Sequence, residues 1–301
     1  MNTCVTNTEK LESKNKLRDL YNLTKPTITF LVVVTVLPAM LLSSETLPSG
    51  LLVLYTLLGT GLMSASAAVF NQILEENVDQ TMERTRSRSL PSGKVSTSFA
   101  FMFGTILGLL GACLLYLKTT PLALWVSLFG HLFYTVIYTL ILKRKTPQNI
   151  VIGGIAGAVG PLIGSAAVSG SLNWMSWTLF LIITLWTPPH FWALALKYKK
   201  DYEKAGIPMY PNIYGDESTR KAMMYYSISL IPFVLSFFIF QKAGWFYFII
   251  ASFCALKFAY DSFEIYRSHS NEKVMRFFYF SCTYTFVIFL ALTIDRLLIL
   301  Q

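Results

Sequence analysis

The chain alternates long apolar runs with shorter polar connections. Each run is close to or above the roughly 20 residues that an α-helix needs to cross a bilayer. Nine runs predict nine membrane-spanning helices, at about 27–43, 51–74, 97–117, 121–142, 150–169, 174–196, 223–241, 244–260 and 277–299. We therefore expect an all-α, polytopic membrane protein in which residues 25–301 form one domain after a cytoplasmic N-terminal segment, residues 1–24. A polar, lysine-bearing stretch precedes the first run, so no removable signal peptide is expected.

Composition and charge agree with this pattern. The 301 residues are 54% hydrophobic and only 14% charged. On a nine-helix zigzag, all of the 25 Lys and Arg except Lys118, Lys242 and Arg296 fall on the side of the N-terminus. The positive-inside rule then predicts a cytoplasmic N-terminus and an external C-terminus in a bacterial cell membrane. The net charge of +9 follows from this asymmetry, so nucleic acid is excluded as a partner.

Oxygen-bearing side chains recur at a regular spacing after the second apolar run. Asn71, Glu75, Asp79 and Glu83 stand four residues apart. On a helix such residues drift by only about 40° per step, so they face nearly one direction. Mg²⁺ is commonly held by one or two carboxylates together with phosphate oxygens of a substrate. The spacing therefore predicts a metal site.

Three arginines follow this stripe, at Arg84, Arg86 and Arg88. Guanidinium groups pair with phosphate through charge-assisted hydrogen bonds. The alternative is a solvated helix extension stabilised by i,i+4 pairs, which the absence of an interleaved lysine disfavours. We interpret the segment as a diphosphate site at a membrane face, capped by the loop that ends at Gly93.

A second long cytoplasmic connection, 187–215, follows the sixth run on the same side. Its tandem proline, Pro188-Pro189, is expected to interrupt the sixth helix and to orient the side chain of His190 toward a cavity. Asp201 stands among lysines, and we expect it to complete the cation site from the opposite side. Most of these lysines, by contrast, are expected to mark the cytoplasmic side. Both loops are expected to close over one cavity.

Two further basic positions lie at the same face. Lys143 and Arg144 end the fourth run, and Lys25 precedes Pro26 at the start of the first, where it serves as an anchor or as a phosphate contact. Small residues after this patch have the small-xxx-small spacing that allows close helix approach in lipid. These are Gly153, Gly154, Gly157, Gly160 and Gly164.

The motifs in the two loops resemble those of a known family. Asn71-xxx-Glu75-xxx-Asp79 with Arg84-Thr85-xx-Arg88 and Pro91-x-Gly93 resembles the first acidic motif of UbiA-type intramembrane prenyltransferases. Pro188-Pro189-His190-Phe191-Trp192, Asp201-Tyr202 and Ala205-Gly206-Ile207-Pro208-Met209 look like the second loop of the heme-farnesylating members. The resemblance covers roughly residues 25–215.

The resemblance implies a nine-helix bundle around a central cavity and Mg²⁺-dependent transfer of farnesyl from farnesyl diphosphate to a vinyl group of heme b, giving heme O. It implies the following roles: Asn71, Glu75, Asp79 and Asp201 as catalytic and metal-binding residues, Lys25, Arg84, Arg88, Lys143, Arg144 and Lys200 as diphosphate-binding residues, and His190 and Trp192 as heme-binding residues. A second motif with a single aspartate leaves the number of Mg²⁺ ions open. Association with heme A synthase or a terminal oxidase pathway is a further expectation.

Three other functions are compatible with parts of the sequence. A prenyltransferase with a quinone-precursor or chlorophyll-type acceptor would use the same diphosphate site, but the PPHFW segment argues against it. A transporter would also carry intramembrane charges and broken helices, yet no internal repeat is visible and the charges cluster on one face. A structural respiratory-assembly protein would show no turnover with Mg²⁺.

Overall fold

The computed structural model describes residues 16–300, and the described chain is helical, with no strand in it. A short helix, Lys16–Leu23, is bent by 49° against α2. The other elements are α2 (Pro26–Leu42), α3 (Gly50–Leu74), α4 (Glu76–Thr81), α5 (Thr97–Lys118), α6 (Pro121–Leu132), the π-helix η1 (Phe133–Leu142), α7 (Lys143–Lys145), α8 (Asn149–Ala158), α9 (Gly160–Ser169), α10 (Trp174–Lys197), α11 (Lys199–Lys204), α12 (Tyr210–Ile239), α13 (Trp245–Ser268) and α14 (Asn271–Leu300).

The nine predicted spans are all present as helices. Eight segments of residues 16–300 are long and apolar enough to cross a membrane, and the bent pair that contains α2 makes a ninth. The last three helices extend beyond their predicted ends; α12, for example, begins at Tyr210 and bends at Gly215, where φ is 82°. The apolar run marks the part of a helix that meets lipid, whereas charged turns can prolong the helix outside it. The all-α, multi-pass class is confirmed.

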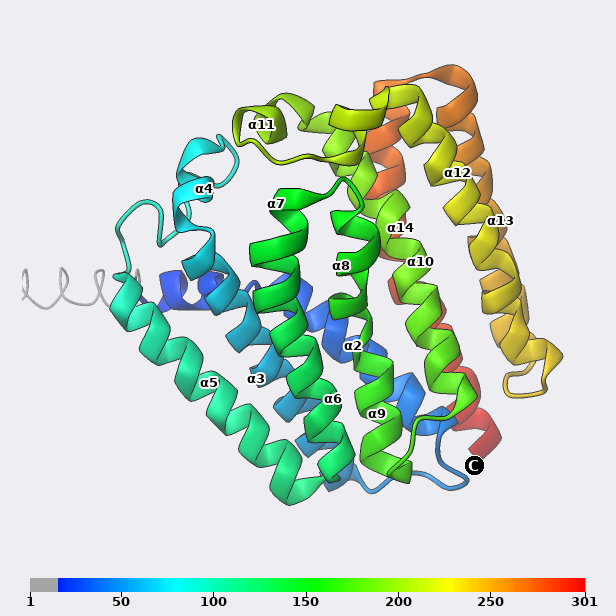
Figure 1. The fold of residues 1–301 in the computed structure, drawn as a ribbon. Helices are drawn as coiled ribbons and strands as arrows, with labels where there is room; N and C mark the ends of the chain where they lie inside the picture. Colours follow the sequence, from blue (N-terminus) through cyan, green and yellow to red (C-terminus); the bar gives the residue numbers. More distant parts are fainter. Residues whose placement is uncertain (1–15, 301) are drawn as a thin grey trace, which may run out of the picture.

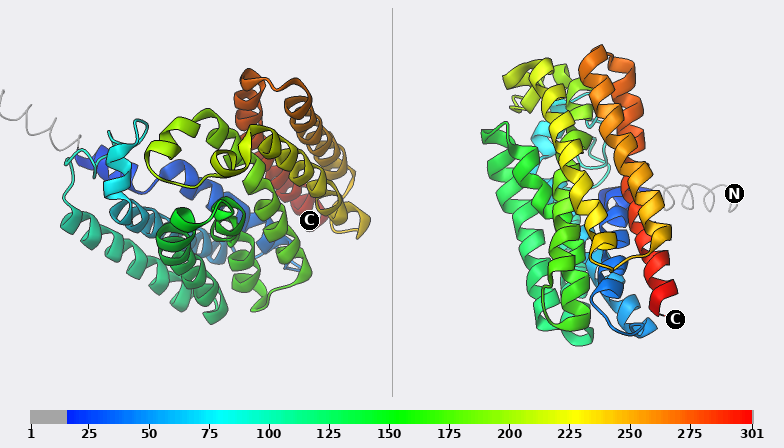
Figure 2. Two further views of the ribbon diagram at one scale, coloured as in Figure 1. Left: turned by 45° about the horizontal axis from the view of Figure 1, so that its top comes forward. Right: turned by 90° about the vertical axis from the view of Figure 1, so that its right-hand side faces the viewer.

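The helices form a closed arrangement in chain order. Each span packs on the next, α10 also packs on α8, α12 and α14, and α14 returns to α2 (Figure 1). In the right-hand view of Figure 2 most of the long helices run roughly along one direction. The segments α4, α7 and α11 gather at one end, here called the loop-bearing end, and the C-terminus lies at the other. The two long connections therefore do share one end of the bundle.

Polar side chains of α14 close the ring at the far end. Arg296 is one of the three basic residues expected on the side opposite the N-terminus. It is buried and donates to the carbonyls of Leu41 and Ser44 at 3.3 and 3.4 Å. The neighbouring Asp295 accepts hydrogen bonds from the backbone N–H groups of Gly244 and Tyr247, at the start of α13. The last helix thus satisfies free backbone groups at the ends of two others.

The glycines of α8 and α9 have two different roles. A Cβ added at Gly160 or Gly164 would lie 2.8 or 2.4 Å from a backbone carbonyl of α2, so these two positions allow close helix approach as predicted. A Cβ at Gly153 would collide with the ring of Tyr138. Gly157, by contrast, has nothing within 4 Å and faces a cavity. The packing interpretation therefore holds for most of the series but is wrong for Gly157.

The structure corrects two expectations about helix ends. Helix α10 runs through Pro188 and Pro189 without a break, so the prediction that this pair interrupts the sixth helix is wrong. Both prolines are buried among neighbouring helices, the setting in which membrane helices tolerate proline. Conversely, the acidic stripe is not on one helix. Helix α3 ends at Leu74, Glu75 links it to α4 with φ −104° and ψ 4°, and Asp79 lies on α4.

Candidate functional site

A cavity of about 440 Å³ opens among α2, α3, η1, α8 and α10 near the loop-bearing end. Charged and polar groups line one part of it, namely Lys25, Asn71, Glu75, Asp79, Arg84, Arg88, Tyr134, Tyr138 and Lys143. Apolar groups, among them Leu31, Val32, Ile150, Ile183 and Trp186, line another part. A volume of this size is typical of small-molecule sites. The cavity thus combines a charged part with an apolar part.

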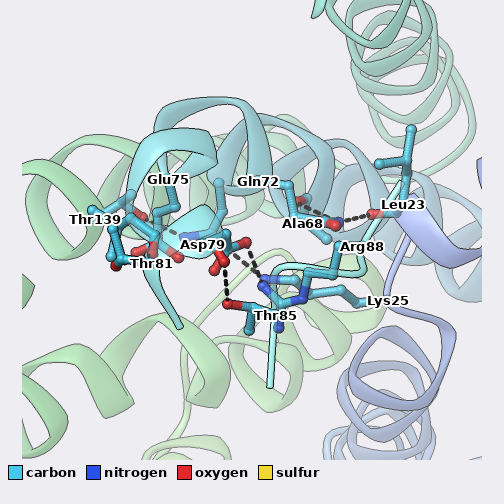
Figure 3. A network of polar contacts seen from close by, with 12 residues as sticks. Leu23, Lys25, Ala68, Gln72, Glu75, Asp79, Thr81, Thr85, Arg88 and Thr139 are labelled. Atoms are coloured by element: carbon cyan, nitrogen blue, oxygen red, sulfur yellow. Dashed lines mark hydrogen bonds and ion pairs between the residues drawn. The ribbon is translucent and has the colours of Figure 1, made fainter. Parts of the chain in front are cut away.

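Three of the four acceptors of the predicted stripe, Asn71, Glu75 and Asp79, meet a basic side chain in the structure. Lys25 Nζ lies 2.5 Å from Asn71 Oδ1, and Lys143 Nζ lies 2.5 Å from Glu75 Oε1. Figure 3 shows the third contact, Arg88 Nη1 to Asp79 Oδ2, at 2.7 Å. Asn71, Glu75 and Asp79 are all buried. Three oxygen acceptors and three basic groups therefore lie within hydrogen-bond distance of one another in one wall of the cavity.

Local backbone features aim these side chains. Lys25 sits between two helices with φ 45°, in the left-handed region, and Gln72 anchors the preceding turn by donating to the carbonyl of Leu23 at 2.6 Å (Figure 3). Asn71 Nδ2 donates to Thr139 Oγ1 at 2.9 Å, which turns Asn71 Oδ1 toward Lys25. Thr139 lies in the π-helix η1, and π-helical turns are frequent at functional sites.

The electrostatic balance of the cavity favours an anion. Four basic side chains, Lys25, Arg84, Arg88 and Lys143, line it together with two carboxylates. Burial lowers the pKa of Lys25 to about 7, so an anion bound beside it would favour its charged form. Burial acts to raise the pKa of Glu75, but the positive charges of Lys143 and Lys25 outweigh burial and hold this pKa below its usual range. Glu75 is therefore charged at neutral pH, ready to bind a cation.

The donor set fits Mg²⁺ without a dedicated protein cage. Among residues 16–300 no group of three or more His, Cys, Asp or Glu residues could hold a metal ion. Two carboxylates and an amide oxygen at one cavity wall nevertheless match an ion that takes its remaining ligands from phosphate and water. The site is thus suited to a metal that arrives with a diphosphate.

His190 lies in the same cavity, on the uninterrupted helix α10. Its ring stacks between Trp186 and Phe278, with centroids 4.3 and 4.7 Å away. His190 Nδ1 is 2.5 Å from Ser281 Oγ, and this hydroxyl donates its own hydrogen to the carbonyl of Phe278. Ser281 must therefore accept a hydrogen from Nδ1. The lone pair of the neutral ring is then on Nε2, which has no partner in the described chain.

Five of the residues predicted for the site do not line this cavity. Trp192 is buried on another face of α10, against Tyr210 and Tyr226. Asp201 and Lys200 lie on α11, where their neighbour Tyr202 is the residue that reaches the cavity. Arg144 is exposed and donates to the carbonyl of Leu74 at 3.3 Å. Glu83 is exposed as well, so Asp79 is the last residue of the stripe that lines the cavity.

The sequence interpretation did not assign a site role to several side chains that the fold brings to the cavity. Tyr134 and Tyr138 stack with centroids 5.6 Å apart, and Tyr134 OH lies 3.5 Å from Lys25 Nζ. The four-residue spacing of the two tyrosines, next to a basic helix end, is the sequence feature that could have indicated their role in the site. Ser281, which orients His190, carries no such signal because serine is common in membrane helices.

Comparisons with known proteins agree with this geometry. The model of the UbiA prenyltransferase family matches residues 32–289. The chain is 42% identical over 282 residues to the protoheme IX farnesyltransferase of Gloeobacter violaceus, covering 93% of this chain and 92% of that protein. It is 39% identical over 292 residues to the protoheme IX farnesyltransferase of Alcanivorax borkumensis, covering 96% of each.

Solved structures share the fold. A structure described as digeranylgeranylglyceryl phosphate synthase superposes with a TM-score of 0.77 at 22% identity, covering 94% of this chain and 99% of that one. A UbiA homolog from Archaeoglobus fulgidus bound to DMAPP and Mg²⁺ gives a TM-score of 0.66 at 14% identity, covering 92% and 99%. Fold and site thus define a polytopic intramembrane prenyltransferase. The chain belongs to the UbiA prenyltransferase family, as its loop motifs indicate.

Proposed function

We propose that this prenyltransferase transfers the farnesyl group of farnesyl diphosphate to a vinyl group of heme b and forms heme O, with Mg²⁺ as cofactor, at the cytoplasmic face of a bacterial cell membrane. The observation that carries the proposal is the set of three acceptor–cation pairs at one side of an apolar cavity. Heme b is proposed as the prenyl acceptor because relatives that match nearly the full chain are named protoheme IX farnesyltransferase.

The pairs suit a site that must bind a metal and a diphosphate together. In the structure Glu75 and Asp79 neutralise Lys143 and Arg88, and the neutral Asn71 accepts a hydrogen bond from Lys25. Asn71, Glu75 and Asp79 would hold Mg²⁺, and Lys25, Arg88 and Lys143 would contact diphosphate oxygens. When bound, Mg²⁺ supplies Lewis-acid stabilisation of the charge that develops on the diphosphate. Lys25, Arg88 and Lys143 add preorganised positive charge at the same oxygens.

The apolar part of the cavity suits the rest of the reaction. The stacked rings of Tyr134 and Tyr138 present aromatic surface beside the charged groups, and such surface stabilises an allylic cation. A further cavity of about 90 Å³ shares Ile28, Val32 and Gly157 with the main one and offers space for the prenyl tail. The vinyl carbon forms the new C–C bond, and water then adds to the resulting cation with loss of a proton.

His190 supports heme as the acceptor. The free lone pair on Nε2 suits a bond to heme iron, whereas a propionate would need a hydrogen-bond donor there. Of the two roles considered for this residue, the hydrogen bonds around Ser281 therefore favour iron ligation. A quinone precursor contains no metal and would make no use of this lone pair.

The direct test incubates the purified protein with farnesyl diphosphate, Mg²⁺ and heme b, and measures the mass of the heme. Addition of a farnesyl group and one water supports the proposal. Quinone-precursor and chlorophyll-type acceptors form parallel arms. Prenylation of one of these acceptors with heme unchanged would assign the chain to another branch of the family.

A second test uses His190→Ala, with His269→Asn as the control. Both changes remove a histidine, but His269 is exposed at the end of α13 and lines neither cavity, and asparagine tolerates its left-handed φ of 54°. We expect His190→Ala to lose heme affinity, the heme absorption change and heme O formation while it retains Mg²⁺-dependent binding of farnesyl diphosphate. A variant that binds heme b and makes heme O as well as the parent would remove this role from His190.

A further inference from the structure

A third cavity, the side cavity, has a volume of about 240 Å³ at the loop-bearing end. Its lining comes from both long connections and from α7, and consists of Glu75, Val78, Lys143, Arg144, Ala205, Gly206 and Ile207. Glu75 and Lys143 also line the main cavity. Because these two side chains are joined by an ion pair of 2.5 Å, the pair stands between the two cavities.

The side cavity runs from the surface to the metal-binding wall. Glu75 is only 4% exposed, whereas Arg144 and Gly206 are exposed. The side cavity therefore links the surface at the loop-bearing end with a buried carboxylate of the site. Two consecutive cations, Lys143 and Arg144, lie along this path.

The two products of prenyl transfer need different exits. The prenylated acceptor is apolar and can leave into lipid. Pyrophosphate carries several negative charges, and moving it through hydrocarbon is strongly unfavourable. Arg144 donates to the carbonyl of Leu74 through Nη2 only, so its other N–H groups have no partner within residues 16–300 and are free to bind an anion.

We propose that the side cavity is an exit site for inorganic pyrophosphate, and that the Glu75–Lys143 pair is its gate. The proposal rests on the function proposed above, which produces pyrophosphate. The bond between prenyl carbon and diphosphate oxygen breaks in the main cavity, and the oxygen keeps the electron pair. Lys143, which already contacts the diphosphate, then releases the departing anion to Arg144 and to water and pairs with Glu75 again. Arg144 thus acts on the product rather than on the substrate.

The test separates chemistry from release. Prenylated product is measured by chemical quench in the first turnover, and free pyrophosphate by a stopped-flow assay with pyrophosphatase and a phosphate sensor. Ala205→Trp fills the side cavity, and Arg144→Ala removes its outer cation. Their matched controls are Lys204→Trp and Lys145→Ala, which alter exposed neighbours that do not line it.

We expect both test variants to form product in the first turnover as fast as the parent but to release pyrophosphate more slowly. Loss of one charge-assisted contact corresponds to about tenfold or more for Arg144→Ala. Both controls should release it at the parental rate. Parental release from Arg144→Ala together with a stably inserted Ala205→Trp would overturn the exit site. If neither the parent nor any variant prenylates heme b, the result contradicts the proposed function.

Discussion

Replacing Asp79 by Asn tests the metal and diphosphate site most directly. The change preserves size and removes one negative charge from a side chain that is 2% exposed and 2.7 Å from Arg88 Nη1. The local fold should survive, because Thr85 holds this turn through the backbone carbonyl of residue 79 at 2.9 Å, not through its carboxylate. The variant therefore isolates the charge.

The expected magnitude follows from the contact that is lost. A hydrogen bond or ligand contact to a charged group contributes about 1.5 to 3 kcal/mol, which is about ten- to a hundredfold in affinity. We expect the Mg²⁺ concentration for half-maximal turnover to rise by about this factor, so that turnover is lost at ordinary Mg²⁺. Binding of farnesyl diphosphate without Mg²⁺ should persist, because Arg88 is then released from its strongest partner.

The assay is a Mg²⁺ titration of heme prenylation in membranes with matched amounts of inserted protein. Glu83→Gln is the control, because it removes a carboxylate four residues away that is exposed and outside the cavity. It should titrate like the parent. Near-normal turnover of Asp79→Asn at ordinary Mg²⁺ would refute the assignment of the metal site.

Three further predictions follow from particular contacts. Arg88→Ala should weaken diphosphate binding by about ten- to a hundredfold, whereas Arg84→Ala should do less because Arg84 is exposed and stacks over a tyrosine; competition binding measures both. A reporter near Thr97 should face the cytoplasm and one fused to the C-terminus should face outward; two reporters on the same side would contradict nine spans. Gly164→Ala should lower stability in detergent by about 1 to 3 kcal/mol, measured by thermal unfolding, because its Cβ would lie 2.4 Å from the carbonyl oxygen of Val36.

The helices could be predicted well because a helix that crosses a membrane needs a long apolar run, which is easily recognised in a sequence. A run of about 20 apolar residues has few alternatives to a membrane helix, and all nine runs became helices. The interruption expected at Pro188-Pro189 was wrong for a related reason. Sequence shows the missing N–H groups, but not the neighbouring helices among which α10 buries both prolines without a break.

The candidate site was predictable only in part, because its contacts are not local. Asn71, Glu75 and Asp79 could be grouped by their spacing, although the chain bends at Glu75. Their partners could not be assigned in this way, since Lys25 is 46 residues from Asn71 and Lys143 is 68 residues from Glu75. Only the closed ring of helices brings these residues together. A lysine that contacts a carboxylate in this buried wall can still bind the substrate. The pairing holds both groups in place until a metal ion binds the carboxylate and a diphosphate binds the lysine.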